Sequence, residues 1–203
     1  MIDRIYFIRG NHEDFHWLQS QKLTVQSDFV PVDPFDLLYY AADGAILNHG
    51  GLSIAFLGGI ETPTYEQKSI DPRSYEKLMS LRPRSVDILV THDAPYGIAK
   101  DFRGGTQGSP LVEDLIRRIE PKYLISGHYH HMNGPISFGI TTYLGLNILV
   151  PPLRRDESRR VQPGSLAILD TETNHLKFVT EDWLSRFAKD FDFIRYMDEL
   201  RFS

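Results

Sequence analysis

Three short apolar runs, each followed at once by a polar cluster that contains histidine, constrain the fold of this chain more than any other feature. RIYFIR (4–9) precedes Gly-Asn-His-Glu-Asp, DILVT (87–91) precedes His-Asp, and YLIS (123–126) precedes Gly-His-Tyr-His-His. Runs of this length and composition predict strands. In α/β sheets, ligands and catalytic groups gather beyond the carboxyl ends of the strands. We therefore expect the three clusters to converge on one edge of the sheet structure.

The rest of the chain alternates between helical and strand patterns. We predict helices over 13–21, 71–81 and 110–120, and one helix or two over 181–200. We predict a pair of strands over 45–51 and 53–59, and further strands over 135–140, 141–149, 165–170 and 175–180. Strands that alternate with helices and are then followed by a run of strands indicate a layered α/β domain with a mixed sheet. Residues 1–203 show no repeat or linker, so a single domain is expected.

Composition argues against several classes of protein. The chain of 203 residues carries a net charge of −5, unlike the basic proteins that coat duplex nucleic acid. It contains no cysteine, which rules out disulfides and thiolate metal sites. Its start lacks a signal-peptide pattern and its apolar runs are too short to span a bilayer, so a cytoplasmic protein without membrane contact is expected.

The residue types at the three strand ends favour a metal site. Asn11 supplies an amide oxygen, and His92, His128 and His130 supply imidazoles, which suit borderline divalent ions. The alternative for each histidine is a polar side chain satisfied within the fold, and that interpretation is preferred for four other histidines. These are His16, His49, His131 and His175.

Three motifs carry a resemblance to a known family. GNHED (10–14), THDAPYG (91–97) and GHYHH (127–131) resemble, in order, the third, fourth and fifth motifs of the calcineurin-like metallophosphoesterases. A looser similarity connects VDILVTHDAPYG (86–97) and GSPLVEDLIRRIEPKYLISGHYHH (108–131) to lariat-debranching-type phosphodiesterases.

This resemblance implies a four-layer α/β/β/α sandwich with mixed sheets and a two-metal hydrolase site. Asn11, His92 and His128 would bind one ion, His130 would bind the other, and His12 would act as the catalytic general acid or phosphate stabiliser. The implied cofactors are divalent ions (Mn, Fe, Zn or Ni). The implied substrate is a phosphorylated small molecule or nucleotide, with nucleic acid as a further candidate, and the implied reaction is hydrolysis of a phosphoester, in particular a phosphodiester.

The chain departs from the family pattern at its start. The family's Asp-x-His and Gly-Asp-x-x-Asp motifs, which supply a bridging carboxylate, do not precede Asn11. We therefore expect a domain that lacks its first strands and binds one ion or none, with Asp93 as a candidate to orient His92. Three explanations stay open: a truncated sequence, a partner chain that supplies the missing strands, or a degenerate relative that acts as a non-catalytic binding or regulatory protein.

Overall fold

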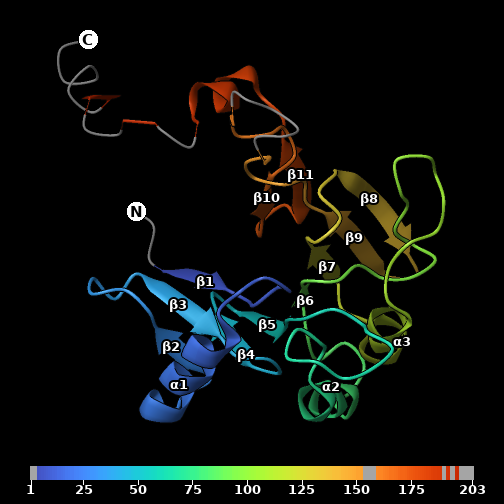
Figure 1. Ribbon diagram of the computed structural model, residues 1–203. Coiled ribbons are helices and arrows are strands. Elements are labelled where there is room, and N and C mark those ends of the chain that lie inside the picture. The colour runs from blue at the N-terminus through green and yellow to red at the C-terminus, as the bar shows by residue number, and fades with distance from the viewer. Residues whose placement is uncertain (1–3, 153–158, 189–190, 193–194, 197–203) are drawn as a thin grey trace. The chain divides into compact units, whose positions relative to one another are not determined.

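The computed structural model describes residues 4–152, 159–188, 191–192 and 195–196. The chain divides into two compact units, Met1–Gly145 and Leu146–Ser203 (Figure 1). The prediction of a single domain stays a prediction. All candidate site residues lie in the first unit. Among the described residues of both units, no helix is long and apolar enough to cross a membrane.

The first unit begins with a small sheet and one helix. Its elements are β1 (Ile5–Phe7), α1 (Phe15–Val25), β2 (Phe29–Pro31) and β3 (Leu38–Ala41). The strand order is β1-β3-β2, with β1 parallel and β2 antiparallel to β3. β2 and β3 are not among the predicted strands, because they are short and the segment between them is interrupted by proline and aspartate. Asp33 closes that segment by accepting the backbone N–H groups of Phe35, Leu37 and Leu38.

A larger sheet follows, with the order β4-β5-β6-β7-β9-β8. Its strands are β4 (Ile46–His49), β5 (Leu52–Leu57), β6 (Ile88–Thr91), β7 (Tyr123–Ser126), β8 (Asn133–Phe138) and β9 (Thr141–Gly145). β5, β6, β7 and β9 are parallel, while β4 and β8 pair antiparallel at the two edges. The predicted strands and the expectation of a mixed sheet are thus confirmed. Because β5, β6 and β7 are parallel, their carboxyl ends share one edge.

Helices α2 (Pro72–Met79) and α3 (Pro110–Ile119) connect these parallel strands. Each begins where the sequence predicts it, with a capping side chain followed by proline in the first turn. Asp71 accepts the backbone N–H of Ser74, and Ser109 accepts that of Val112. Local chemistry therefore sets where both helices begin.

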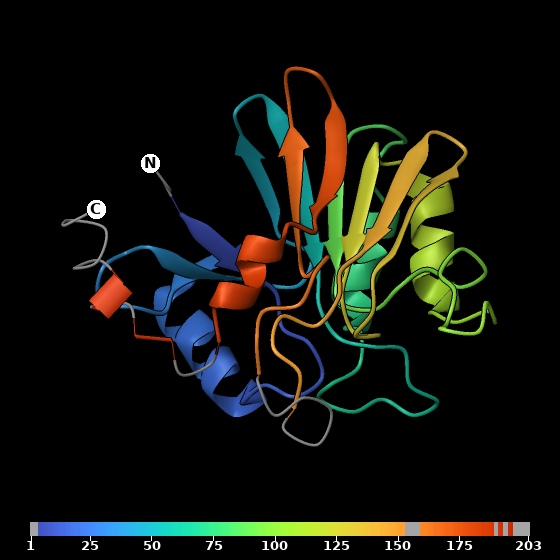
Figure 2. The same cartoon turned by 90° about the horizontal axis from the view of Figure 1, so that it is seen from above.

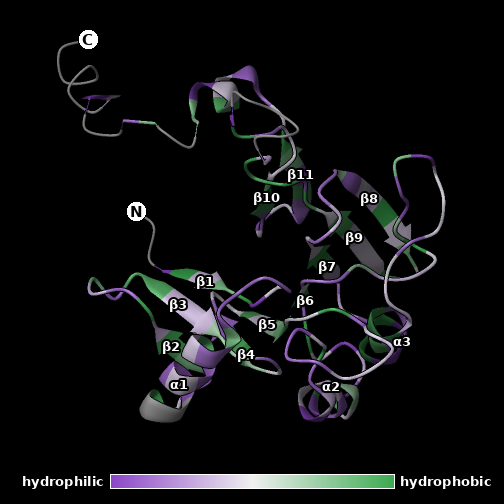
Figure 3. Cartoon of the chain, in the orientation of Figure 1, coloured by the Kyte–Doolittle hydropathy of each residue, from purple (hydrophilic) through white to green (hydrophobic). Residues whose placement is uncertain are grey.

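The first unit has four layers, as the resemblance implies. Alternate residues of β1 face opposite ways: Phe7 packs against the cluster that contains Leu18 of α1, whereas Tyr6 packs against the cluster that contains Phe56 of β5. On the far face of the large sheet, α2 and α3 cover a third cluster. Figures 1 and 2 show α1 on one side of the unit and α2 and α3 on the opposite side. The buried strands carry hydrophobic residues, while the loop after β1 is hydrophilic (Figure 3).

The second unit contains an antiparallel hairpin of β10 (Leu166–Asp170) and β11 (His175–Val179). The prediction of one helix or two over 181–200 is confirmed only in part among the described residues. A 3₁₀ helix covers Asp182–Arg186, after which Phe187 is extended and Ala188 forms a bridge with Arg160. Residues 195–196 are helical again. Residues 189–190, 193–194 and 197–200 of the predicted helix lie outside the described residues. Pairing of Ala188 with a distant segment interrupts the helical pattern at this point.

Candidate metallophosphoesterase site

The carboxyl ends of β1, β5, β6 and β7 meet at one place. The Gly59 N–H donates to the Arg9 carbonyl at 3.2 Å, which joins the end of β1 to the end of β5. The His92 N–H donates to Leu57 O at 3.2 Å, and the Gly127 N–H donates to His92 O at 3.3 Å. The three polar clusters that the sequence places after strands are therefore brought together by the fold.

Asn11, His92 and His128 form the centre of this arrangement, which we call the imidazole cluster. Asn11 Oδ1 lies 3.0 Å from His92 Nε2, and the rings of His92 and His128 lie 5.0 Å apart between centroids. Gly10 makes the close approach possible, since a Cβ at this position would lie 2.6 Å from the His92 ring. The side chains thus converge as the strand-end argument predicts.

Two histidines of the GHYHH segment (127–131) have a backbone conformation that is rare for residues with a side chain. His128 has φ = 69° and His130 has φ = 58°, both in the left-handed region. Side chains other than glycine disfavour this region because Cβ approaches the carbonyl oxygen. Residues held in such conformations concentrate at functional sites, where the surrounding structure maintains them. The sharp turn sets the direction of both imidazoles.

Burial keeps the central imidazoles neutral. It lowers the pKa of His92 to about 4, with the neighbouring His128 as the next cause. Burial also lowers the pKa of His128, against the opposing effect of Asp93. Neutral imidazoles have a free lone pair, so at neutral pH both rings are in the form that binds a metal ion.

His12 and His130 lie at the exposed margin of the cluster. Both side chains are exposed, and both lower the pKa of His92 through their charge. The His12 backbone N–H donates to Glu13 Oε2 at 3.2 Å. These two residues are therefore near the imidazole cluster while remaining open to solvent.

Asp93 makes other contacts than the sequence suggested. Its Oδ2 accepts the Glu61 N–H at 3.0 Å, and its Oδ1 accepts the Ala94 N–H at 2.9 Å. A side-chain hydrogen bond also joins Tyr129 to this carboxylate. Asp93 thus holds the loop after β5 in place beside His128, where a cavity of about 340 Å³ is lined by both Asp93 and His128.

Sequence reasoning missed the ion pair between Arg9 and Asp43. Arg9 Nε lies 2.6 Å from Asp43 Oδ2, while Nη1 donates to Gln67 O at 2.8 Å and Nη2 to Ser69 O at 2.7 Å. Asp43 Oδ1 accepts the Gly58 N–H at 2.9 Å. We call this group the Arg9–Asp43 clamp. It ties three loops together directly before Gly10 and Asn11, and a charged residue at the end of an apolar run was its one signal in the sequence.

The loop over residues 99–108 is anchored beside the GHYHH segment (127–131). His131 Nε2 lies 2.7 Å from Lys100 O, and Asn133 Nδ2 also donates to that carbonyl. The ring of Phe102 contacts that of His131 in a tilted arrangement, with 4.2 Å between the ring centroids. His131 therefore has partners within the fold, as the sequence interpretation preferred.

The donors present fit a borderline divalent ion by chemical type. Two ligands that each lie about 2.1 Å from one ion at a right angle are about 3 Å apart, and Asn11 Oδ1 and His92 Nε2 lie 3.0 Å apart. Over the ranges that the structure describes, no three His, Asp or Glu side chains group closely enough to hold an ion alone. The set that fits therefore includes the amide of Asn11 and consists of neutral donors.

Comparison with known proteins shows a family and several relatives. The sequence pattern of the family described as calcineurin-like phosphoesterase matches residues 1–132. The lariat debranching enzyme of Schizosaccharomyces pombe is 26% identical over 156 residues, which cover 61% of this chain and 32% of that protein. The enzyme of the same name from Entamoeba histolytica is 29% identical over 168 residues, covering 65% of this chain and 45% of its own length. Lariat debranching enzyme A of Xenopus laevis is 29% identical over 157 residues, covering 61% and 28%. The chain spans less than half the length of each of these relatives.

Proposed function

Because the chain belongs to the calcineurin-like phosphoesterase family, we propose that it hydrolyses a phosphodiester of the nucleotide type at the imidazole cluster, with the help of divalent ions. The family and the relatives point to a phosphoesterase hydrolase. The choice of a phosphodiester, and of RNA as its source, is supported by the similarity to proteins named lariat debranching enzymes.

The convergence of Asn11, His92 and His128 is the single observation that carries the proposal. Residues separated by 81 positions, Asn11 and His92, come within 3.0 Å at a strand edge. Gly10 has no side chain to obstruct this contact, and the strained backbone at His128 sets the direction of its ring. Polar groups gathered in this way at strand ends are typical of a ligand site.

In this proposal Asn11, His92 and His128 hold one divalent ion and His130 contributes to a second. Such ions polarise phosphoryl oxygens and supply a nucleophile at neutral pH. His12 stands at the exposed margin, where it can donate a proton to the departing oxygen of the substrate. The Arg9–Asp43 clamp and Gly10 position Asn11, and the contacts of Asp93 hold the β5 loop that borders the cavity.

A non-catalytic binding protein on the same fold is the second candidate. One observation favours it: the described residues contain no group of three His, Asp or Glu side chains that could hold an ion. Neutral donors alone bind a divalent ion without compensating its charge, which predicts weak binding.

The test separates the ligands from the proton donor. His92→Ala and His128→Ala should abolish Mn²⁺ uptake in equilibrium dialysis and hydrolysis of bis(p-nitrophenyl) phosphate, because the ion loses a ligand. His12→Ala should retain the ion and reduce turnover by about 10²–10⁴-fold, as loss of a general acid does. His49→Ala changes an exposed histidine on β4 and serves as the matched control.

Two results would contradict these assignments. Equal metal loss in the His12, His92 and His128 variants would remove the separate role of His12. Metal uptake and hydrolysis that persist in the His92 and His128 variants would show that the imidazole cluster is not the site. Native protein that takes up Mn²⁺ but hydrolyses neither this substrate nor an RNA dinucleotide would favour the non-catalytic candidate.

A further inference from the structure

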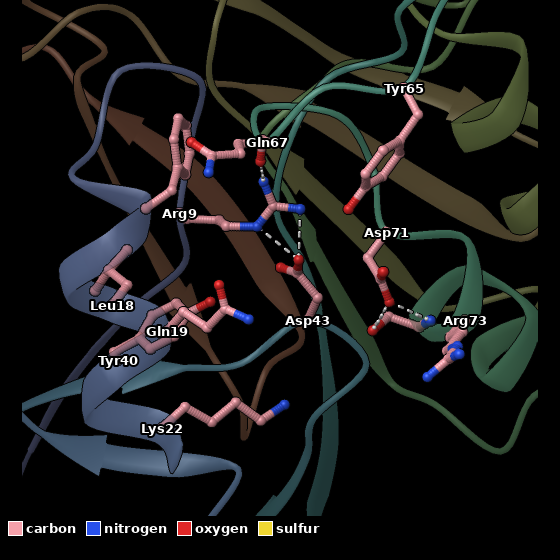
Figure 4. A pocket seen from close by; sticks show the side chains of 12 residues that line it. Arg9, Leu18, Gln19, Lys22, Tyr40, Asp43, Tyr65, Gln67, Asp71 and Arg73 are labelled. Atoms are coloured by element: carbon pink, nitrogen blue, oxygen red, sulfur yellow. Dashed lines mark hydrogen bonds and ion pairs between the residues drawn. The ribbon is translucent and has the colours of Figure 1, made fainter. Parts of the chain in front are cut away.

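We propose that a second cavity, beside the Arg9–Asp43 clamp, binds one nucleotide of the substrate through its phosphate and its base. This inference deepens the proposed function and rests on it, because the nucleotide belongs to the substrate only through that function. The cavity has a volume of about 430 Å³ and lies between α1, the first turn of α2 and the segment around Tyr65 (Figure 4). Small-molecule sites in proteins have volumes of about 300–1,000 Å³, so a mononucleotide is of suitable size.

The acidic residues that line the cavity are already bonded within the fold. Asp43 is paired with Arg9 and accepts the Gly58 N–H. Asp71 Oδ2 accepts both the backbone N–H and the hydroxyl of Ser74, each at 2.8 Å, and so caps α2. Both carboxylates therefore already accept hydrogen bonds from the protein, and the guanidinium of Arg9 is held in a fixed position in the cavity lining.

Two cations from different helices remain available to a ligand. Lys22 of α1 directs its ammonium group into the space, and Arg73 in the first turn of α2 lies across from it (Figure 4). Lys22 Nζ is 3.9 Å from Asp28 Oδ1, a distant contact between side chains that are each about half exposed. Ion pairs of this kind contribute little, so Lys22 can turn to an anion. A guanidinium and an ammonium together match the oxygens of a phosphate.

The remaining lining groups suit a base. Tyr65 is 64% exposed, and its ring stands at the cavity with the hydroxyl directed inward (Figure 4). Exposed aromatic rings of this kind form stacking platforms for nucleic-acid bases. The side-chain amides of Gln19 and Gln67 also line the cavity. An amide has both donors and an acceptor, which can pair with the polar edge of a base.

The cavity and the imidazole cluster are joined by three consecutive residues. Arg9 lines the cavity, Gly10 packs against the His92 ring, and Asn11 contacts His92 Nε2. A nucleotide seated beside Arg9 therefore lies next to the place where its neighbouring phosphodiester would be cleaved. The two positions together would favour a substrate with at least two nucleotides over a simple phosphoester.

The experiment measures binding without catalysis. Adenosine 5′-monophosphate is titrated into the full chain by calorimetry in the presence of EDTA, with adenosine and inorganic phosphate as separate arms. Lys22→Gln and Arg73→Gln should each weaken binding of the nucleotide about tenfold, through loss of one charged hydrogen bond. Tyr65→Ala should weaken the nucleotide and leave inorganic phosphate unchanged. Arg82→Gln removes an exposed cation outside the cavity and should have no effect.

Absence of saturable nucleotide binding would overturn the proposal. So would equal affinity for the nucleotide and for inorganic phosphate, because the base would then not be recognised. Native affinity for the nucleotide in both the Lys22 and Arg73 variants, with unchanged thermal unfolding, would show that the nucleotide does not bind in this cavity. Since EDTA removes divalent ions, nucleotide binding without any hydrolysis in the Mn²⁺ assay would refute the proposed function alone, and hydrolysis without nucleotide binding would refute the cavity alone.

Discussion

The Arg9–Asp43 clamp and the imidazole cluster lie next to each other but use their polar groups in opposite ways. In the clamp, the guanidinium donates to a carboxylate and to two backbone carbonyls, and both charged side chains are 9% exposed. In the cluster, Asn11 Oδ1 and His92 Nε2 meet each other, and the pKa of His92 is lowered so that the ring stays neutral. Buried polar groups are nearly always bonded, and the clamp meets this rule with charged groups. In the cluster the corresponding contact joins two neutral groups, which are the proposed ligands of an ion.

The two ends of the segment 9–11, in the loop after β1, thus have different tasks. Arg9 determines where the strand end lies, and Asn11 presents a donor from that fixed position. A change in the clamp should therefore act first on stability, while a change in the cluster should act first on ligand binding.

Asp43→Ala should give the largest loss of stability. It leaves the Arg9 guanidinium buried without its carboxylate, and removal of one partner of a buried ion pair lowers the free energy of unfolding by about 3–5 kcal/mol. Urea denaturation followed by circular dichroism measures the difference. The matched control is Glu120→Ala, which breaks an exposed pair with Arg84 and should lower it by at most about 1 kcal/mol. Similar losses in both variants would show that the clamp is no more than a surface contact.

Gly10→Ala should act on both regions. The added Cβ would lie 2.6 Å from the His92 ring, so the ring has to move away from Asn11. Overpacking of this kind lowers the free energy of unfolding by about 1–3 kcal/mol, and Mn²⁺ uptake should fall with it. Gly127→Ala, in the GHYHH segment, is the matched control, because an added Cβ there has no atom within 4 Å. Native Mn²⁺ uptake in the Gly10 variant would show that the Asn11–His92 contact is not needed.

A comparison of His130→Gly with His130→Ala tests the strain in the cluster. Residue 130 has φ = 58° and is exposed, so glycine should be more stable than alanine by about 1 kcal/mol at this position. At Glu76, an exposed position of α2, the order should reverse by about the same amount, because glycine disfavours a helix. Thermal unfolding of the four variants measures both differences. Greater stability of alanine at residue 130 would mean that its backbone is not held in the left-handed region.

Much of the fold was predictable because its signals are local. Asp71-Pro72 and Ser109-Pro110 each place a capping side chain directly before a proline, and the helices begin there. The apolar runs before His92 and His128 predicted strands of the required kind, and strand-end reasoning then brought Asn11, His92 and His128 together. These inferences depend on residues within a few positions of one another, for which local backbone chemistry is decisive.

The sequence by itself thus determined the α/β class, the starts of helices α2 and α3 and the edge at which the histidines meet. Only the tertiary structure decided that Arg9 pairs with Asp43 across 34 positions, that Asp93 bonds to the Glu61 backbone, and that Lys22 and Arg73 face one cavity. It also decided that the helical pattern is interrupted at Phe187 and Ala188, where Ala188 pairs with Arg160. The physical reason is the same in each case: a charge or an apolar face has many suitable partners along a chain. Which of them it finds depends on how the strands and helices pack.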